Sequence, residues 1–215
     1  MKTEPAAPAI QSPGRIELAA IFSATAALLI ATGIAPYDRL TWVMEVIWVA
    51  VALPVLIATR RSFPLTALLY RLLFVHAAIL IIGGYYTYAR VPLGFWFADF
   101  FHLARNHYDR LGHLVQGFVP AIFWREILIR RSPLAGSRWL PAVVVSLCLA
   151  FAAFFELIEW WSALVMGGAA DAYLATQGDP WDTQWDMFLA LVGSIAALAA
   201  LSRLHDRELG RRRAG

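Results

Sequence analysis

The fold is decided by residues 139–166, which read WLPAVVVSLCLAFAAFFELIEWWSALVM. These 28 residues contain only two charged side chains, Glu156 and Glu159. The hydrocarbon core of a bilayer is about 30 Å thick, so a helix needs roughly 20 mostly apolar residues to cross it. The stretch is long and apolar enough, and it predicts a transmembrane helix.

The whole chain has the same character. Of its 215 residues, 60% are hydrophobic and 15% are charged, whereas about 25% of the residues in a soluble domain are charged. This composition excludes a water-soluble globular domain and a disordered chain, and the lipid bilayer is the expected partner. A net charge of +3 reflects cytoplasmic arginines, so no nucleic-acid partner is expected. The lone Cys148 lies in an apolar run and predicts a small core residue without a disulfide.

Five further stretches are candidates for spanning helices, of which Leu111–Ile129 is more polar than the others. We therefore predict an all-α, polytopic membrane bundle of about six helices over residues 16–202, after a flexible tail (1–15) and before a basic tail (203–215). The first span is too long for a secretory signal core and is expected to be retained. The six predicted spans are Ile16–Ala35, Leu40–Thr59, Leu65–Tyr88, Leu111–Ile129, Trp139–Met166 and Gln184–Ser202.

The basic residues predict the orientation of these spans. Six crossings place both termini on one side, and twelve of the 18 Lys and Arg residues fall on that side against four on the other. Short cytoplasmic loops carry an excess of Lys and Arg, so both termini are expected in the cytoplasm of a bacterial inner membrane. The twelve are Lys2, Arg15, Arg60, Arg61, Arg130, Arg131, Arg138, Arg203, Arg207, Arg211, Arg212 and Arg213.

The acidic residues gather on the opposite side. Ten of the fifteen lie on or near the outer face, although acidic residues contribute little to topology. Membrane insertion therefore does not explain the clustering, and a functional site does. The ten are Asp38, Glu45, Asp99, Asp109, Glu156, Glu159, Asp171, Asp179, Asp182 and Asp186.

Three polar segments are expected to meet at this face, because two spans enter the membrane there and the span between them leaves it. Asp109 and His113 are four residues apart, and Glu156 and Glu159 are three apart, so each pair shares a helix face. Carboxylates and imidazoles at one depth suit Zn, Mn or Fe, or Mg where carboxylates dominate. We predict metal binding by His107, Asp109, His113 and Asp186, and catalysis by Glu156, Glu159 and Asp182.

Several of these residues also have a purely structural interpretation. Asp179 before Pro180 is typical of a helix N-cap, and Asn106 is a similar candidate, which would leave Asp182 and Asp109 in first turns. His205 is expected to be solvated in the cytoplasmic tail and Glu45 to face water. Two carboxylates one turn apart in an apolar helix are costly without a partner, so this interpretation is weakest for Glu156 and Glu159.

Basic and aromatic side chains flank the same segments. Arg105 and Arg110 are candidates for holding a phosphate. Trp181 and Trp185 are candidates for lining a substrate pocket, although the interfacial aromatic belt is the commoner role of tryptophan.

Two long strings carry a resemblance to a known family. One runs from His107-Tyr-Asp-Arg-Leu-Gly-His113 through Gln116 to Arg125-Glu126, and the other comprises Phe155–Trp161 and Gln177–Met187. Together they resemble the YjdF-like bacterial inner-membrane proteins, over about residues 60–201. The resemblance implies a polytopic inner-membrane protein and transfers no catalytic residue.

Three classes of function remain open. The first is a metal-dependent hydrolase or transferase acting at the outer leaflet on a lipid-linked or phosphorylated substrate. The second is a structural or assembly protein whose polar cluster joins helices. The third is a proton-coupled transporter, which the lack of inverted repeats disfavours. The oligomeric state and the identity of any metal are left open by the residues.

Overall fold

The computed structural model describes residues 10–167 and 176–210, and every regular element in them is a helix. Residue Asp171, one of the ten outer acids, lies outside the described residues. The helices, listed in chain order, are α1 (Arg15–Ile34), α2 (Arg39–Thr59), α3 (Ala67–Tyr86), α4 (Pro92–Phe101), α5 (Tyr108–Arg131), α6 (Leu140–Met166) and α8 (Asp182–Glu208).

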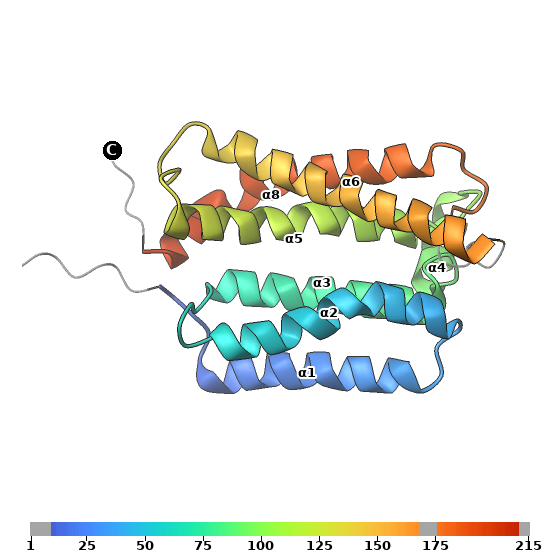
Figure 1. Cartoon of the computed structure of the whole chain (residues 1–215), viewed down its shortest axis with the longest axis horizontal. Coiled ribbons are helices and arrows are strands. Elements are labelled where there is room, and N and C mark those ends of the chain that lie inside the picture. Colours follow the sequence, from blue (N-terminus) through green and yellow to red (C-terminus); the bar gives the residue numbers. More distant parts are fainter. Residues whose placement is uncertain (1–9, 168–175, 211–215) are drawn as a thin grey trace, which may run out of the picture.

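Five of these helices, α1, α2, α3, α6 and α8, are long and apolar enough to cross a membrane. The fourth predicted span, Leu111–Ile129, corresponds to α5, which carries more polar residues and is not among the five. Helix α5 lies between α3 and the α6–α8 pair (Figure 1), and its polar side chains Asp109, His113, Arg125 and Glu126 are buried. The surrounding helices shield them, which explains why α5 can be polar within an apolar bundle.

The ends of the helices follow ordinary capping chemistry. The Asp38 carboxylate accepts a hydrogen bond from the Thr41 amide at 2.7 Å, which caps α2 and holds the pKa of Asp38 below its usual value. Proline occupies the first turns of α4 and α6, where its missing N–H costs nothing. Helix α4, ten residues long, was not predicted because it is too short to span.

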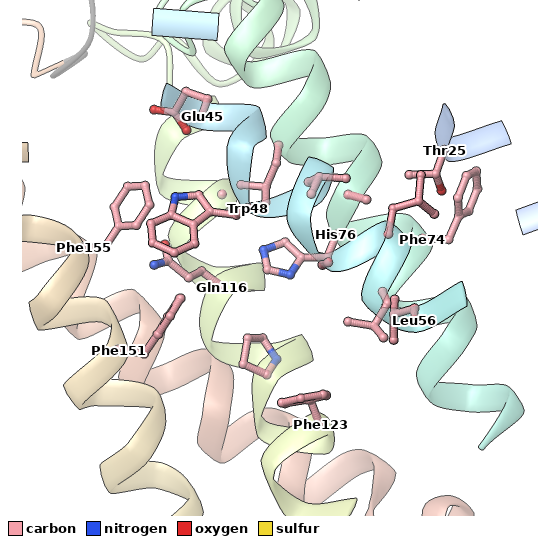
Figure 2. A pocket seen from close by; sticks show the side chains of 18 of the residues that line it. Thr25, Glu45, Trp48, Leu56, Phe74, His76, Gln116, Phe123, Phe151 and Phe155 are labelled. Carbon is pink, nitrogen blue, oxygen red and sulfur yellow. The ribbon is translucent and has the colours of Figure 1, made fainter. Parts of the chain in front are cut away.

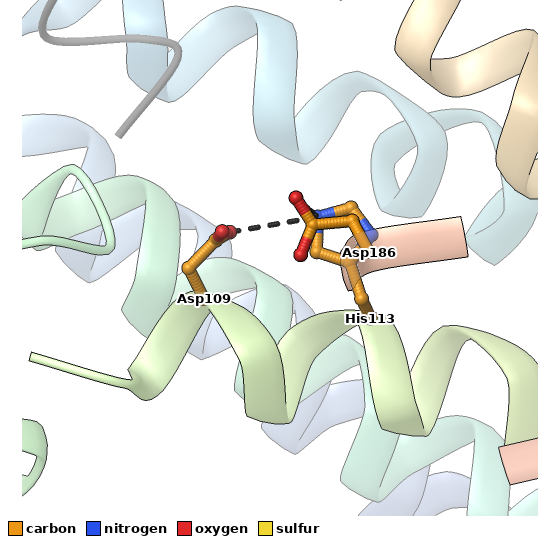
Figure 3. Close-up of side chains that lie close together, drawn as sticks. All are labelled: Asp109, His113 and Asp186. Carbon is orange, nitrogen blue, oxygen red and sulfur yellow. Dashed lines mark ion pairs between the residues drawn. The ribbon is translucent and has the colours of Figure 1, made fainter. Parts of the chain in front are cut away.

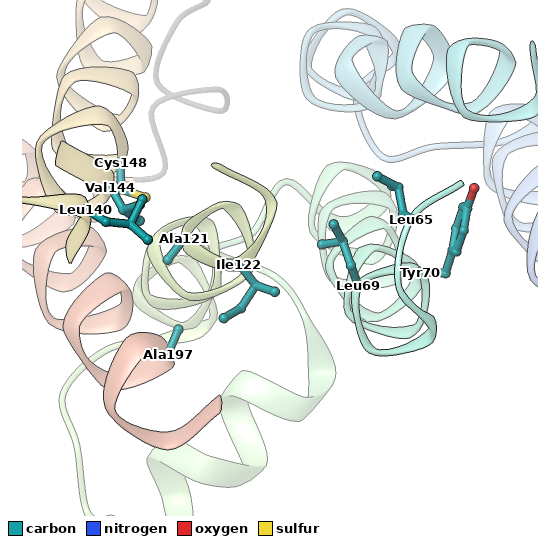
Figure 4. Packing of buried hydrophobic residues seen from close by; sticks show 9 residues of the cluster. All are labelled: Leu65, Leu69, Tyr70, Ala121, Ile122, Leu140, Val144, Cys148 and Ala197. Carbon is teal, nitrogen blue, oxygen red and sulfur yellow. The ribbon is translucent and has the colours of Figure 1, made fainter. Parts of the chain in front are cut away.

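The bundle consists of two groups of three helices (Figure 1). Helices α1, α2 and α3 pack together, α5, α6 and α8 pack together, and α3 meets α5 between the groups. A buried apolar cluster of α3, α5, α6 and α8 residues lies across this junction (Figure 4). It includes Cys148, which is 1% exposed and free, as predicted.

The closest helix pair is α5 with α8, and glycines make the approach possible. A Cβ atom on Gly117 would lie 1.9 Å from the Ala190 carbonyl oxygen, and one on Gly193 would lie 2.0 Å from the Leu114 carbonyl oxygen. Small residues allow helix backbones to approach in this way. The contact fixes the positions of polar residues on α5 relative to those on α8.

The two ends of the described chain meet at one end of the bundle. The Gln11 amide donates to the Glu208 carbonyl at 2.8 Å, and the Ala67 amide donates to the Gln11 carbonyl at 2.9 Å. Helix α8 begins two residues before the predicted span and continues six residues beyond it, to Glu208. The last residues before α1 are therefore held against α3 and α8.

The expectation that His205 is solvated is wrong, because the side chain is 0% exposed. The extension of α8 puts His205 on the same helix face as Ala190, Ser194 and Ala197, which are also fully buried. Its Nε2 atom lies 3.0 Å from a Glu126 carboxylate oxygen, and its Nδ1 atom lies 2.9 Å from the Arg125 guanidinium.

Glu126 is the centre of this second polar cluster. Its carboxylate also accepts from the Thr66 hydroxyl at 2.8 Å and from the Arg130 guanidinium at 2.7 Å. Because a guanidinium can only donate, His205 Nδ1 accepts and Nε2 carries the hydrogen that is donated to Glu126. The buried charges of this cluster are thus paired and hydrogen-bonded.

Candidate functional site

The candidate site lies at the end of the bundle where α5 and α8 begin and α6 ends. The structure brings together five of the residues named from the sequence, Asp109, His113, Glu156, Glu159 and Asp186. Two overlapping groups of side chains have donor atoms within 4.8 Å of one another: Asp109, His113 and Asp186, and His113, Glu156 and Glu159. We call these five residues the inner cluster.

His113 is the centre of the inner cluster. Its Nε2 atom lies 3.6 Å from an Asp109 oxygen and 3.8 Å from an Asp186 oxygen (Figure 3). Its Nδ1 atom lies 3.9 Å from a Glu156 oxygen. These distances exceed those of hydrogen bonds, which are about 2.7–3.2 Å, so the groups face one another without direct bonding.

The spacing matches that of atoms arranged around a metal ion. Ligand bonds of about 2.0–2.2 Å at tetrahedral angles separate neighbouring ligand atoms by roughly 3.3–3.6 Å. The separations from His113 Nε2 to Asp109 and Asp186 are close to this range. One imidazole nitrogen and two carboxylate oxygens, from two helices, are therefore placed as three ligands would be.

The inner cluster is buried, which makes polar atoms without a hydrogen-bond partner costly. Four members of the inner cluster are buried, with Asp186 only 2% exposed. His113 Nδ1, Glu156 Oε1 and Asp186 Oδ1 have no hydrogen-bond partner within the described part of the chain, and each such atom costs about 1–3 kcal/mol. Four carboxyl groups around one imidazole leave an excess of negative charge that metal ions or protons would neutralise.

The other predicted residues form a separate group nearer the end of the bundle. Arg105 binds Asp179 at 3.1 Å and Asp182 at 2.9 Å, and Arg110 binds Asp179 at 2.6 Å. His107 Nδ1 lies 3.2 Å from the Arg110 guanidinium. We call these five residues the outer ion-pair network.

His107 and Asp182 therefore do not join the inner cluster. Burial, together with the adjacent charges of Arg110 and Arg105, lowers the pKa of His107, so the imidazole is neutral beside two cations. Asp182 lies one helix turn before Asp186 and is held by Arg105 instead. The pairing partners, Arg105 on the α4–α5 loop and Arg110 in the first turn of α5, decide this division, and spacing along the chain does not reveal them.

Arg105 and Arg110, the candidate phosphate ligands, already have carboxylate partners. Arg110 also lies over the ring of Trp185, 5.1 Å from its centroid. Trp181 and Trp185 are 63% and 44% exposed and line a shallow surface hollow with Gln184 and Phe188. An anionic group would have to displace Asp179 to reach both guanidiniums.

The predicted N-caps are shifted. Helix α8 begins at Asp182, with Trp181 rather than Asp179 at the N-cap, and α5 has His107 rather than Asn106 there. Asp179 still accepts from the Trp181 amide at 3.0 Å, and Asn106 accepts from the Tyr108 amide at 3.0 Å. Both side chains thus accept hydrogen bonds within or next to the loop before the helix, and neither residue is the N-cap.

The inner cluster opens into a cavity of about 350 Å³ that the sequence did not reveal (Figure 2). Asp109, His113 and Glu159 lie in its wall, together with Glu45 of α2. The expectation that Glu45 faces water is wrong, because it is 3% exposed. An acidic residue within an apolar span was the available signal, but only the packing of α2 shows that Glu45 shares the cavity.

His76 of α3 is a second residue in this wall whose role was missed. Its Nε2 atom is buried in the cavity wall without a hydrogen-bond partner within the described residues. In Figure 2 the ring lies between Trp48 and Leu56, below Glu45. It is thus a polar group in a mainly apolar stretch of the cavity.

Comparisons with known proteins agree with this architecture. Residues 17–207 match the family described as "Predicted membrane protein (DUF2238)". The chain is 52% identical to the inner membrane protein YjdF of Escherichia coli (strain K12) over 184 residues, which cover 86% of this chain and 88% of the relative. No solved structure matches. The expected resemblance and the expected inner-membrane location are confirmed.

Proposed function

The chain belongs to the DUF2238 family of predicted membrane proteins, and we propose that it is a metal-dependent hydrolase or transferase embedded in the inner membrane. Its site is the inner cluster, and its substrate is lipid-linked or phosphorylated. The observation that carries the proposal is the ligand-like spacing of Asp109, His113 Nε2 and Asp186. In the same cluster, His113 Nδ1, Glu156 Oε1 and the second oxygen of Asp186 are buried without a hydrogen-bond partner among the described residues.

The geometry supports a division of roles within the inner cluster. Asp109, His113 Nε2 and Asp186 supply three ligands, which is the number found in catalytic zinc sites that keep a position for water. Glu156 faces His113 Nδ1, where a carboxylate would accept the remaining imidazole hydrogen and orient the ring. The expected ion is Zn, Mn or Fe, since the set mixes imidazole with carboxylates.

Glu159 is assigned the role of general base. It lies in the cavity wall beside Asp109 and His113 and is the least buried member of the inner cluster. A metal-bound water is the nucleophile that such a site supplies near neutral pH, and an adjacent carboxylate is suited to take its proton. His107, Asp182, Arg105 and Arg110 act from the outer ion-pair network, where they would meet the polar part of the substrate.

The proposal also requires a particular topology, with six crossings and both termini in the cytoplasm. Three observations support it: the Gln11–Glu208 contact joins the two ends of the described chain, basic residues are concentrated on that side, and other helices shield α5 from lipid. In this orientation the inner cluster lies near the outer leaflet.

Metal analysis of detergent-purified protein tests the proposal. We expect about one divalent ion per chain in the wild type and its loss in Asp186→Asn, because three ligands are reduced to two. Asp182→Asn is the matched control, since Asp182 lies one turn away on α8, is similarly buried at 6%, and binds Arg105. Absence of a stoichiometric ion from wild-type protein expressed with Zn, Mn and Fe would refute the proposal.

A structural or assembly role is the second candidate. The cluster around Glu126 shows that this chain joins helices through buried charge, and the inner cluster would do the same if its carboxyl groups were protonated. That role predicts that Glu156→Gln lowers the melting temperature while the wild type contains no metal. The metal content of the wild-type protein therefore distinguishes the two candidate functions.

A further inference from the structure

The cavity beside the inner cluster is long and narrow. Its lining residues on α5 extend from Asp109 to Trp124, which is roughly 22 Å of helix at 1.5 Å per residue. Those on α2 extend from Glu45 to Leu56, or about 16 Å. A volume of about 350 Å³ spread over this length leaves a mean cross-section of roughly 16–22 Å². Carbon atoms pack 3.5–4.0 Å apart, so this width suits a single hydrocarbon chain.

The cavity has one polar end and one apolar end. Its acidic residues lie at the end that holds the inner cluster. The remainder of the wall is mainly aromatic and aliphatic, and includes Trp124 as well as Leu56, Phe74, Phe123 and Phe151 (Figure 2). Cavities with apolar walls stay dry, so water is a poor occupant of the long apolar part.

The flank of α2 gives the cavity contact with the surrounding bilayer. Trp48 and Val55 line the cavity and are 37% and 53% exposed, so the cavity is not closed off along this side of α2. Helices α2 and α6 meet there through Trp48, whose ring centroid lies 6.2 Å from those of Phe151 and Phe155. The wall between lipid and cavity is therefore made of side chains that can rotate.

The unpartnered His76 independently points to a ligand. Its Nε2 atom is buried in the cavity wall without a hydrogen-bond partner among the described residues. His76 is eight residues from Gly84, which packs against Glu45, so it lies roughly 12 Å along α3 from the level of Glu45. A ligand with a hydrogen-bonding group partway along its length would satisfy this atom.

We propose that the cavity binds one acyl chain of a bilayer lipid, which enters beside Trp48 and places its polar head at the inner cluster. The carbonyl or hydroxyl of the bound lipid contacts His76 on the way. The inference deepens the proposed function, on which it rests for the chemistry at the head, by making the substrate an acyl lipid. Binding of the chain itself depends only on the cavity.

Photocrosslinking in nanodiscs tests the proposal. The probe is phosphatidylethanolamine with a diazirine in one acyl chain, doped into phosphatidylethanolamine and phosphatidylglycerol, with crosslinked residues located by mass spectrometry. We expect adducts on Phe123 and Phe151 inside the cavity in addition to adducts on lipid-facing positions such as Val43 and Ile47.

Filling the cavity provides the matched comparison. Ala50 and Ala52 are both exposed on α2, but only Ala52 lines the cavity. Ala52→Trp is expected to reduce the adducts on Phe123 and Phe151 several-fold, and Ala50→Trp to leave them unchanged. Ala77→Phe fills the cavity from α3 and should reduce the same adducts. The test therefore still works if only one of the two variants folds.

The outcomes separate this inference from the proposed function. Adducts confined to lipid-facing residues, or cavity adducts that both filling variants leave unchanged, overturn the inference whatever the metal content is. Measured on the same samples, Asp186→Asn should lose the metal and keep the cavity adducts. Cavity adducts on a wild type that contains no metal would retain the lipid site and refute only the metal-dependent chemistry.

Discussion

Replacement of Gly117 by alanine should force α5 and α8 apart. The added Cβ atom would lie 1.9 Å from the Ala190 carbonyl oxygen, whereas ordinary contacts between such atoms begin at about 3.4 Å. Because the contact is with backbone, no side-chain rotation can relieve it. The helices must therefore separate locally by about 1.5 Å, which is the difference between the two distances.

The cost follows from this geometry. Overpacking of a tight contact costs about 1–3 kcal/mol, and a clash with backbone belongs at the upper end. Alanine is better than glycine in a helix by about 1 kcal/mol, which leaves a net loss of roughly 2 kcal/mol. For a chain of this size the loss corresponds to a decrease in melting temperature of roughly 4–8 °C.

The same displacement reaches the inner cluster. His113 and Asp186 lie one helix turn from Gly117 and Ala190, and their donor atoms are 3.8 Å apart. A further separation of about 1.5 Å would place these two atoms beyond the roughly 4.4 Å that two ligands of one ion can bridge. Gly117→Ala should therefore also lower metal content, although it changes no ligand.

The chain offers a suitable assay. Cys148 is its single cysteine and is 1% exposed, so a thiol-reactive fluorophore should label it only as the bundle unfolds. Gly14→Ala is the control, since a Cβ at Gly14 meets nothing within 4 Å. If Gly117→Ala melts at or above the wild-type temperature, the inferred close packing of α5 and α8 is wrong.

Two further predictions concern the other end of the bundle and its orientation. Glu126→Gln leaves the Arg130 guanidinium and the buried network without their central charge and should lower the free energy of unfolding by about 3–5 kcal/mol. Glu17→Gln, in an exposed pair with Arg71, should leave the melting temperature unchanged. Equal effects of the two substitutions would show that the Glu126 network does not stabilise the bundle. Alkaline phosphatase, which is active only outside the cytoplasm, should be active when fused after Arg90 and inactive when fused after Arg131. The reverse pattern would exclude a topology with cytoplasmic termini.

The positions of most helices could be predicted because hydropathy is a local property. The range predicted for the fifth span, Trp139–Met166, differs from α6 by one residue. Helix α4 and the extension of α8 to Glu208 were missed for a related reason: one is too short to span, and the other continues into polar sequence. Local hydropathy does not identify a helical segment that lies outside a membrane-spanning stretch.

The inner cluster could be anticipated only in part. Alternating helix direction indicates that Asp109, His113, Glu156, Glu159 and Asp186 reach similar depths. Depth does not distinguish His113 from His107, although one belongs to the inner cluster and the other lies beside Arg110. His113 lies within α5 on the side that faces Asp186 of α8, whereas His107 precedes the helix, and only the packing of α5 against α8 shows this difference.

By itself, the sequence determined that this protein is a membrane-embedded helical bundle with few charged residues, because the cost of burying charge in lipid acts on each segment separately. The tertiary structure alone decided which of those charges meet. Glu45 and His76 face the cavity and His205 faces Glu126 because of contacts between helices distant in the sequence. Glycine-mediated approach of α5 to α8 brings His205 to Glu126, and no local pattern of residues encodes the resulting distances.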